Sequence, residues 1–159
     1  MAPTDFSFST FSKNAFYGEL NARLVDMTDL ADGQRIVDLA CGTGGVTRLI
    51  LERIKDARDS VIIAMDQSAA ALKQAMEDLK DIRDNAVQFC HSRVELVSDA
   101  LKERADTVIL CNAIHYISDK DSLVTEISKA LKPGGKFAFN TSFYEGGQHP
   151  ESLQFYRKW

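Results

Sequence analysis

Two short apolar runs constrain the fold more than any other feature of this chain. Residues 61–65 read Val-Ile-Ile-Ala-Met, and residues 107–111 read Thr-Val-Ile-Leu-Cys. Neither run alternates apolar with polar residues, so each predicts a strand that is covered on both faces, as in a parallel sheet. Three more segments of similar length have strand character. The five expected strands are 35–39, 61–65, 86–90, 106–111 and 136–140.

Helical patterns separate most of these strands. After Ser68, a favourable N-cap residue, apolar side chains recur at helical spacing. A third helical pattern ends at Lys132-Pro133-Gly134-Gly135, which is typical of a helix stop and turn. The apolar positions of the three patterns are Val46, Leu49, Ile50 and Ile54; Leu72, Ala75, Met76 and Leu79; and Leu123, Ile127, Ala130 and Leu131. Strands that alternate with helices predict right-handed crossovers and an α/β fold: a doubly wound, Rossmann-like sheet in three layers.

The segment before the first strand predicts an amphipathic helix over residues 13–30. Phe16, Leu20, Leu24 and Met27 lie on one side of that helix. It is either a mobile lid over an apolar substrate or a helix packed against the edge of the sheet, and the second reading is favoured. We therefore expect an N-terminal helical segment or lid over 1–32 and a ligand-binding core over 33–141. Residues 142–159 would begin a substrate-binding insertion or belong to a C-terminal part that is incomplete.

Composition excludes several classes of function. The chain has 159 residues and a net charge of −4, whereas proteins that bind nucleic acid usually carry a basic excess. No apolar run approaches the roughly 20 residues that span a bilayer, and no secretory signal pattern precedes the core. Cys41, Cys90 and Cys111 are odd in number and widely spaced, which favours reduced thiols over a disulfide framework or a metal site. A cytoplasmic protein without nucleic-acid partners is expected.

A glycine-rich loop follows the first strand, at the sheet edge where doubly wound folds bind ligands. The loop has small residues at Ala40, Gly42, Gly44 and Gly45, just after Asp38. A carboxylate there would repel the pyrophosphate of a dinucleotide and attract a cation. S-adenosylmethionine carries a sulfonium and an amine but no phosphate, so it fits this loop better. In the frame that starts at Gly42, the third position of a G-x-G-x-x-G fingerprint is a threonine.

Asp66 ends the second strand, 24 positions after Gly42. An acid at this point can accept hydrogen bonds from both ribose hydroxyls of an adenosine group. Nicotinamide and methyl-donor folds share this feature, so Asp66 supports an adenosine ligand without choosing between them.

The residues Asp38-Leu-Ala-Cys-Gly-Thr-Gly-Gly resemble the glycine-rich motif of class I S-adenosylmethionine-dependent methyltransferases. The resemblance is closest to the small-molecule branch that includes ubiquinone and menaquinone methyltransferases, although Ala40 stands where the family has its first glycine. It continues through Met65-Asp-Gln-Ser, through Ala105 to Tyr116, and through Ile127 to Lys136. Together these motifs cover about residues 33–141 in the family's order.

The resemblance implies the cofactor-binding residues. Asp38, Ala40, Cys41 and Gly42 would surround the methionine part of the cofactor, and Asp66 would bind the ribose. The adenine would lie between Gln67 and Val94, and Asn112 would offer backbone contacts near the sulfonium. Arg93 departs from the family, which has an acid at this position. Arginine cannot accept the hydrogen bond that this acid takes from the adenine amino group.

His115 is the candidate catalytic residue, since it follows the fourth strand at the same edge. It would deprotonate an acceptor hydroxyl, or it is a packed histidine bonded to its surroundings; the second interpretation is favoured. The expected reaction is in-line displacement at the sulfonium methyl by an O, N, C or S nucleophile of a small, apolar or aromatic acceptor. The fourth strand lacks the Asn/Asp-Pro-Pro-aromatic motif of enzymes that methylate nucleobase or glutamine nitrogen.

Two alternatives stay open: an inactive methyltransferase-like module that binds the cofactor, and a nicotinamide-dependent oxidoreductase, which Asp38 and Thr47 disfavour. The resemblance also implies two further antiparallel strands after the fifth, which this sequence does not supply. We therefore expect an incomplete sheet whose fifth strand is exposed at the edge, with a tendency to self-associate or to need a missing C-terminal segment.

Overall fold

The computed structural model describes residues 15–54, 59–82 and 86–141. Residues 1–14 and the segment 142–159, for which a separate role is expected, lie outside the described residues. The strands are β1 (Arg35–Leu39), β2 (Val61–Asp66), β3 (Val87–His91), β4 (Ala105–Cys111) and β5 (Leu131–Asn140). The helices are α2 (Ala15–Asp26), α3 (Gly45–Arg53), α4 (Ala69–Asp78), α5 (Val97–Ala100) and α6 (Lys120–Ala130), with 3-10 turns η1 (Val94–Leu96) and η2 (Ile114–Tyr116).

The five strands form one parallel sheet in the order β3-β2-β1-β4-β5. Chain order reverses between β1 and β4, so the switch point of this doubly wound sheet lies at the end of β1. Asp38 on β1 is level with Ala64 on β2 and with Ile109 on β4. The expected α/β architecture is confirmed, and the loop after β1 lies where ligands bind in such sheets.

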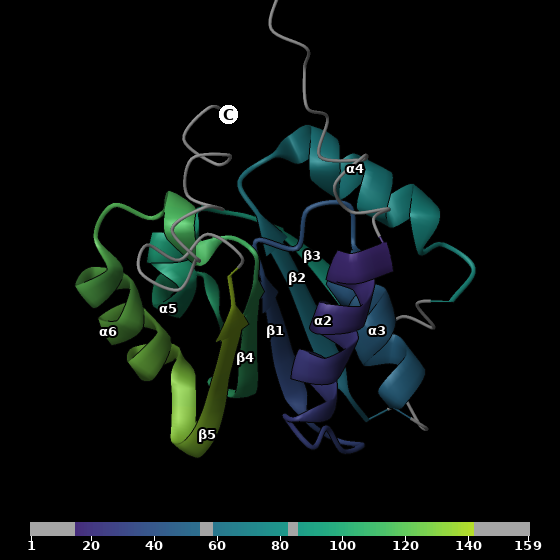
Figure 1. Ribbon diagram of the computed structural model, residues 1–159. Coiled ribbons are helices and arrows are strands. Elements are labelled where there is room, and N and C mark those ends of the chain that lie inside the picture. The colour runs from purple at the N-terminus through teal and green to yellow at the C-terminus, as the bar shows by residue number, and fades with distance from the viewer. Residues whose placement is uncertain (1–14, 55–58, 83–85, 142–159) are drawn as a thin grey trace, which may run out of the picture.

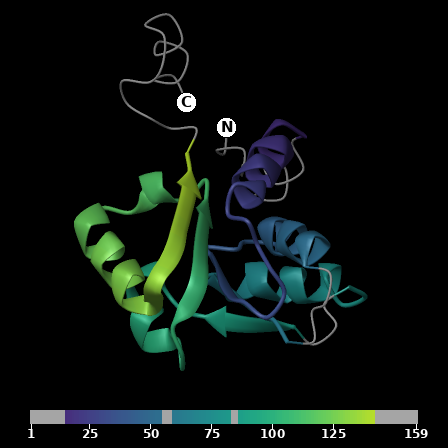
Figure 2. The same ribbon diagram turned by 90° about the horizontal axis from the view of Figure 1, so that it is seen from below.

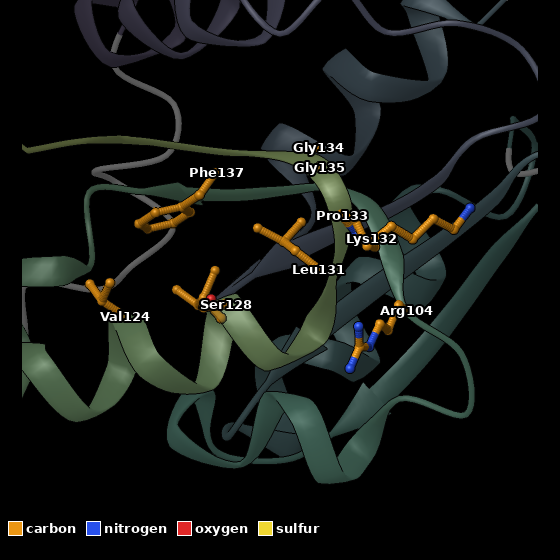
Figure 3. A pocket seen from close by; sticks show the side chains of 10 residues that line it. Arg104, Val124, Ser128, Leu131, Lys132, Pro133, Gly134, Gly135 and Phe137 are labelled. Carbon is orange, nitrogen blue, oxygen red and sulfur yellow. The ribbon is translucent and has the colours of Figure 1, made fainter.

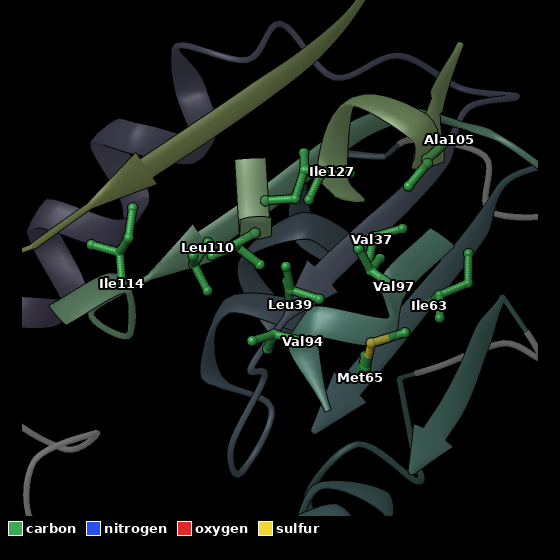
Figure 4. Close-up of a cluster of buried hydrophobic side chains, with 13 residues drawn as sticks. Val37, Leu39, Ile63, Met65, Val94, Val97, Ala105, Leu110, Ile114 and Ile127 are labelled. Atoms are coloured by element: carbon green, nitrogen blue, oxygen red, sulfur yellow. The ribbon is translucent and has the colours of Figure 1, made fainter. Parts of the chain in front are cut away.

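Apolar side chains alternate between the two faces of the sheet and build a separate core on each. Along β1, Ile36 joins one core and Val37 the other, and both are fully buried. The first core packs under α2, α3 and α4, and the second packs under α5 and α6 (Figure 1). Figure 4 shows the second core, where Leu39 and Met65 of the sheet meet Val97 and Ile127 of the helices. This arrangement gives the three expected layers.

The start of β5 differs from the expected strand. The strand is paired with β4 from Leu131, but the pairing then jumps, because Ala105 faces Leu131 and Thr107 faces Lys136. The residues between them form the expected turn, with Gly134 at φ 78°. From Lys136 to Asn140 the strand runs in regular register, as the sequence predicts. Within the described sheet β5 is one of the two edge strands, and Figure 2 shows it beside β4.

The buried face of α2 matches the one that the sequence indicates only in part, because Leu24 packs against the core but the two ends of the expected stripe are exposed. Phe16 is 59% exposed and Met27 is 78% exposed, whereas Val25 is fully buried in the core under α3. The helix ends at Asp26, because Thr28 turns back and donates from both its backbone N–H and its hydroxyl to the carbonyl of Val25. Packing against α3 and β5 selects the face that contains Val25. Among the described residues, no helix has the length and apolar character needed to cross a membrane.

Candidate functional site

The loop between β1 and α3 repeatedly enters left-handed backbone conformation. Ala40, Gly42 and Gly44 have φ of 57°, 54° and 85°. Two backbone bonds hold the loop: Cys41 donates to the Met65 carbonyl at 2.9 Å, and Gly44 donates to the Cys41 carbonyl at 2.9 Å. At Ala40 a side chain adopts a conformation that L residues disfavour, which gives a physical reason for glycine at this position in the family.

Gly44 is required by space as well as by its backbone. A Cβ at this position would lie 2.9 Å from Cδ1 of Leu79 and 3.2 Å from the Ala75 Cβ, both from the α4 region. Helix α3 begins at the next residue, with Gly44 as its N-cap. The loop therefore closes tightly against α4, and the first N–H groups of α3 lie at the same edge of the sheet.

Asp38 lies beneath this loop and is 1% exposed. The Thr47 hydroxyl, from the first turn of α3, donates to Oδ2 of Asp38 at 2.6 Å. Burial raises the pKa of Asp38 to about 7, the Thr47 bond opposes this rise, and repulsion from Asp66 adds to it.

Asp66 joins the loop to the next helix. Its Oδ2 accepts the Gly42 N–H at 2.8 Å, and its Oδ1 accepts the Ser68 N–H at 2.8 Å. Ser68 in turn caps α4 by accepting from Ala71, which confirms the expected N-cap. An ionised carboxylate offers about four acceptor positions, so two remain for a ligand. Asp66 is 7% exposed and lies at the carboxyl end of β2.

The residues expected near the adenine are less uniform. Gln67 is exposed beside Asp66, and its carbonyl lies 3.0 Å from Nε2 of His91. Val94 is buried in the core under α5 and α6, and Ala40 packs against that same core. Arg93 is exposed and forms an ion pair with Glu95 at 3.1 Å.

Asn112 follows β4 with φ of 53° and is held by two other asparagines. Its N–H donates to the backbone carbonyl of Asn140 at 3.1 Å and to Oδ1 of that residue at 2.9 Å. Its side-chain Nδ2 donates to Oδ1 of Asn21 on α2 at 3.0 Å, and Nδ2 of Asn140 donates to the same oxygen at 2.9 Å. The end of β4 is thereby fixed to both β5 and α2.

His115 lies in η2, three residues after Asn112. Its Nδ1 is 3.1 Å from the Thr141 hydroxyl, and its ring centroid is 4.0 Å from that of Tyr116. Burial lowers the pKa of His115, and the charge of the nearby Lys120 lowers it further, so both effects favour the neutral imidazole. A neutral imidazole is able to accept a proton, and its packing also suits a purely structural residue.

All three cysteines are free thiols. Burial raises the pKa of Cys41 and of Cys111, with a further contribution from the charge of Asp38 in each case. These thiols stay protonated and unreactive at neutral pH. Cys41 therefore contributes to the loop through its backbone and its small volume.

Three residues of this region were not predicted from the sequence: Thr47, Asn21 and Asn140. Thr47 entered the sequence argument only as a departure from the dinucleotide fingerprint, although its position in the first turn after the loop places it over β1. Asn140 ends β5 at the same edge as Asp38 and Asp66, so strand-end logic identifies it. Asn21 gives no local signal, because its partners are 91 and 119 positions away.

A groove of about 380 Å³ lies elsewhere, between α6 and the start of β5. Figure 3 shows Val124, Leu131 and Phe137 along it, with Lys132 and Arg104 at one end. Arg104 precedes β4 and Leu131 begins β5, so this groove belongs to the amino edge of the sheet. The glycine-rich loop and the acids lie at the carboxyl edge.

The fold and the site together define a class: a doubly wound α/β protein whose ligand loop lies over two buried acids at the switch point. Within that class, residues 37–137 match the family model described as "Methyltransferase domain". The chain belongs to this family, and the expected resemblance to class I S-adenosylmethionine-dependent methyltransferases of small-molecule type is confirmed.

Individual relatives agree with the family. A probable S-adenosylmethionine-dependent methyltransferase of Saccharomyces cerevisiae is 32% identical over 78% of this chain and 41% of its own length. Malonyl-[acyl-carrier protein] O-methyltransferase of Acetivibrio thermocellus is 32% identical over 74% of this chain and 40% of its own length. The chain thus spans about two fifths of these two relatives.

A solved structure supports the fold. The S-adenosylmethionine-dependent methyltransferase from Thiobacillus denitrificans, in complex with S-adenosyl-L-homocysteine, has a TM-score of 0.67. It is 20% identical, and the match covers 88% of this chain and 54% of that one.

Proposed function

We propose that this chain binds S-adenosylmethionine and takes part in methyl transfer to a small-molecule acceptor. The observation that carries the proposal is the pair of buried acids, Asp38 and Asp66, around a left-handed loop. Burial, with added repulsion from Asp66, raises the pKa of Asp38, so ionisation of both acids is unfavourable unless a positive charge lies nearby. A cationic amine and a sulfonium supply that charge, whereas a pyrophosphate would increase the repulsion.

Each residue has a role that follows from its position. Asp66 has two acceptor positions left for ribose hydroxyls, and the loop from Ala40 to Gly42 lies against the methionine part. Gln67 and Val94 flank the adenine, with Glu95 near enough in sequence to replace the family's acid. Asn112 contributes its backbone beside the reacting methyl. Each of these roles is an inference from position and from the family.

The cofactor supplies an electrophilic methyl group when it is bound, and this chain aligns it. Holding donor and acceptor in line lowers the activation free energy by up to about 7–11 kcal/mol. Neutral His115 accepts the proton of an acceptor hydroxyl if the acceptor does not ionise by itself. Similar proteins are named as O-methyltransferases and as trans-aconitate 2-methyltransferase, which supports a small acceptor without selecting its nucleophilic atom.

Binding calorimetry tests the proposal. We expect the chain to bind S-adenosylhomocysteine and to bind NADH much more weakly or not at all. Asp66→Asn should weaken the binding of S-adenosylhomocysteine by about 1.5–3 kcal/mol, the usual loss for a charge-assisted hydrogen bond. Glu52→Gln, at an exposed position on α3, is the matched control and should bind like the wild type. Tighter binding of NADH, or equal affinity in both variants, would contradict the proposal.

An inactive cofactor-binding module is the second candidate, and its specific basis is that the match covers only about two fifths of each of these two relatives. A turnover assay with candidate acceptors separates the two. Binding of S-adenosylhomocysteine without turnover of any acceptor by the full chain would favour the module.

A further inference from the structure

Three asparagine side chains from separate elements meet at the carboxyl edge of the sheet. Asn21 comes from α2, Asn112 follows β4, and Asn140 ends β5. Oδ1 of Asn21 accepts two hydrogen bonds, from Nδ2 of Asn112 at 3.0 Å and from Nδ2 of Asn140 at 2.9 Å. All three side chains are partly buried, so a lost partner would be poorly replaced by water.

The orientation of each amide follows from one backbone group. The Asn112 N–H is a donor only, so the Asn140 atom 2.9 Å away must be its oxygen. The Nδ2 of Asn140 then faces Asn21, so the Asn21 atom that accepts this bond is its Oδ1. Asn112 consequently presents its nitrogen to the same oxygen. One arrangement satisfies every bond, and in it Asn21 serves as an acceptor of two bonds.

The network holds Asn112 in an unfavourable conformation. Its φ is 53°, in the left-handed region, which asparagine tolerates better than most residues but does not prefer. Both its backbone N–H and its side-chain amide are engaged, and α2 packs against α3 and β5 around the cluster. Removal of the Asn21 oxygen would release two donors at once and free the end of β4.

We infer that Asn21 is a positioning residue of the methyl-donor site, acting through Asn112. This inference rests on the proposed function, in which the Asn112 backbone lies beside the reacting methyl. It assigns α2 a fixed role: the helix is fastened to the strand ends and forms a wall of the site. Both hydrogen bonds to Asn21 end on its side-chain oxygen, so a substitution that keeps an acceptor oxygen there should preserve the role.

A pair of variants separates the acceptor from the shape of the side chain. Asn21→Leu has similar volume and no acceptor, whereas Asn21→Asp keeps an oxygen in the same place. We expect calorimetry to show that Asn21→Leu lowers the affinity for S-adenosylhomocysteine about tenfold, and that the affinity of Asn21→Asp stays within about twofold of the wild type. Hydrogen exchange of α2 and of residues 112–116 should accelerate in Asn21→Leu only. Glu19→Gln breaks an exposed ion pair on the same helix and serves as control.

Each outcome has a defined meaning. Wild-type protein that fails to bind S-adenosylhomocysteine overturns the proposed function, and the hydrogen-exchange comparison still tests the network. Wild-type binding together with unchanged affinity in Asn21→Leu overturns the inference, as does an equal loss in Asn21→Asp. If Asn21→Leu does not fold, Asn140→Asp removes one of the two donors and keeps the oxygen that faces Asn112. A twofold to fivefold loss in that variant supports the inference, and no loss overturns it.

Discussion

At the scale of single residues, ionisation of Asp38 has opposite effects on the stability of the fold and on the binding of a cationic ligand. Its pKa is raised from 3.8 to about 7 in the folded chain, mainly by burial. A carboxyl group with a raised pKa stabilises the fold below pH 4 and loses that contribution as the pH rises to 7. The ionised form that attracts a cationic donor is therefore the form that destabilises the unliganded protein.

Asp38→Asn should separate these two effects. The amide oxygen still accepts the Thr47 hydroxyl, but no charge is buried. We expect the variant to be more stable than the wild type by about 2–4 kcal/mol at pH 8, from a shift of roughly three units, and by much less at pH 5. Urea unfolding at both pH values measures this difference. A stability gain that does not depend on pH would show that Asp38 is not the titrating group.

His115→Ala tests the catalytic reading of the imidazole. As a base, His115 would accept a proton only when neutral, so turnover should fall as the pH drops through its lowered pKa. The variant should lose about 10²–10⁴-fold in kcat and keep its affinity for S-adenosylhomocysteine. Paired measurements of kcat against pH and of binding decide the case. Equal turnover in both proteins, or a loss explained by a lower Tm, would show that His115 has a packing role and is not the base.

At the scale of elements, the loop between β1 and α3 offers two substitutions with opposite expected signs. Ala40→Gly relieves a side chain at φ 57° and should stabilise the chain by up to about 1 kcal/mol. Gly44→Ala adds strain at φ 85° and a contact of 2.9 Å with Leu79. Its cost should reach about 2–4 kcal/mol, because overpacking and left-handed strain add. Thermal unfolding of both variants would refute this account if the signs were alike.

Periodicity predicts the elements of this chain well where burial is strong on both faces. The central strands β1, β2 and β4 agree with expectation within one residue, since their apolar runs are covered from both sides. Helix α2 shows the limit: Phe16 and Met27 fit an apolar stripe, yet contact with α3 and β5 selects the face of Val25. Tertiary packing, which a single helix pattern does not contain, decides which of two overlapping faces is buried.

The site shows the same division. Asp38, Asp66 and Asn112 were predictable because strand ends of a parallel sheet meet at one edge. The bonds that organise them were not, since Thr47 to Asp38 and Asn21 to Asn112 are side-chain contacts between separate elements. Such contacts follow from the fold and leave no periodic trace in the sequence.

At the scale of the whole molecule, the two ends of the sheet differ in chemistry. The carboxyl edge gathers the acids, the loop and the asparagines, whereas the amino edge carries the groove beside α6. In the described sheet β5 and β3 are the two edge strands, and the rings of Phe137 and Phe139 stack on β5 with centroids 5.5 Å apart. Phe139 is 47% exposed. An apolar strand at a sheet edge promotes pairing with another chain.

We therefore expect the 159-residue chain to self-associate through β5 at high concentration. Phe139→Lys places a charge on the edge strand, where charged side chains oppose strand pairing, and should shift the protein toward monomer. Met76→Lys changes an apolar residue that is 42% exposed on α4, which packs against β2 and β3 toward the opposite edge of the sheet, so it should leave association unchanged. Sedimentation velocity from about 10 to 200 μM compares the three proteins. A wild-type chain that stays monomeric across this range, or a Met76→Lys effect as large as that of Phe139→Lys, would show that β5 is not the surface through which the chains associate.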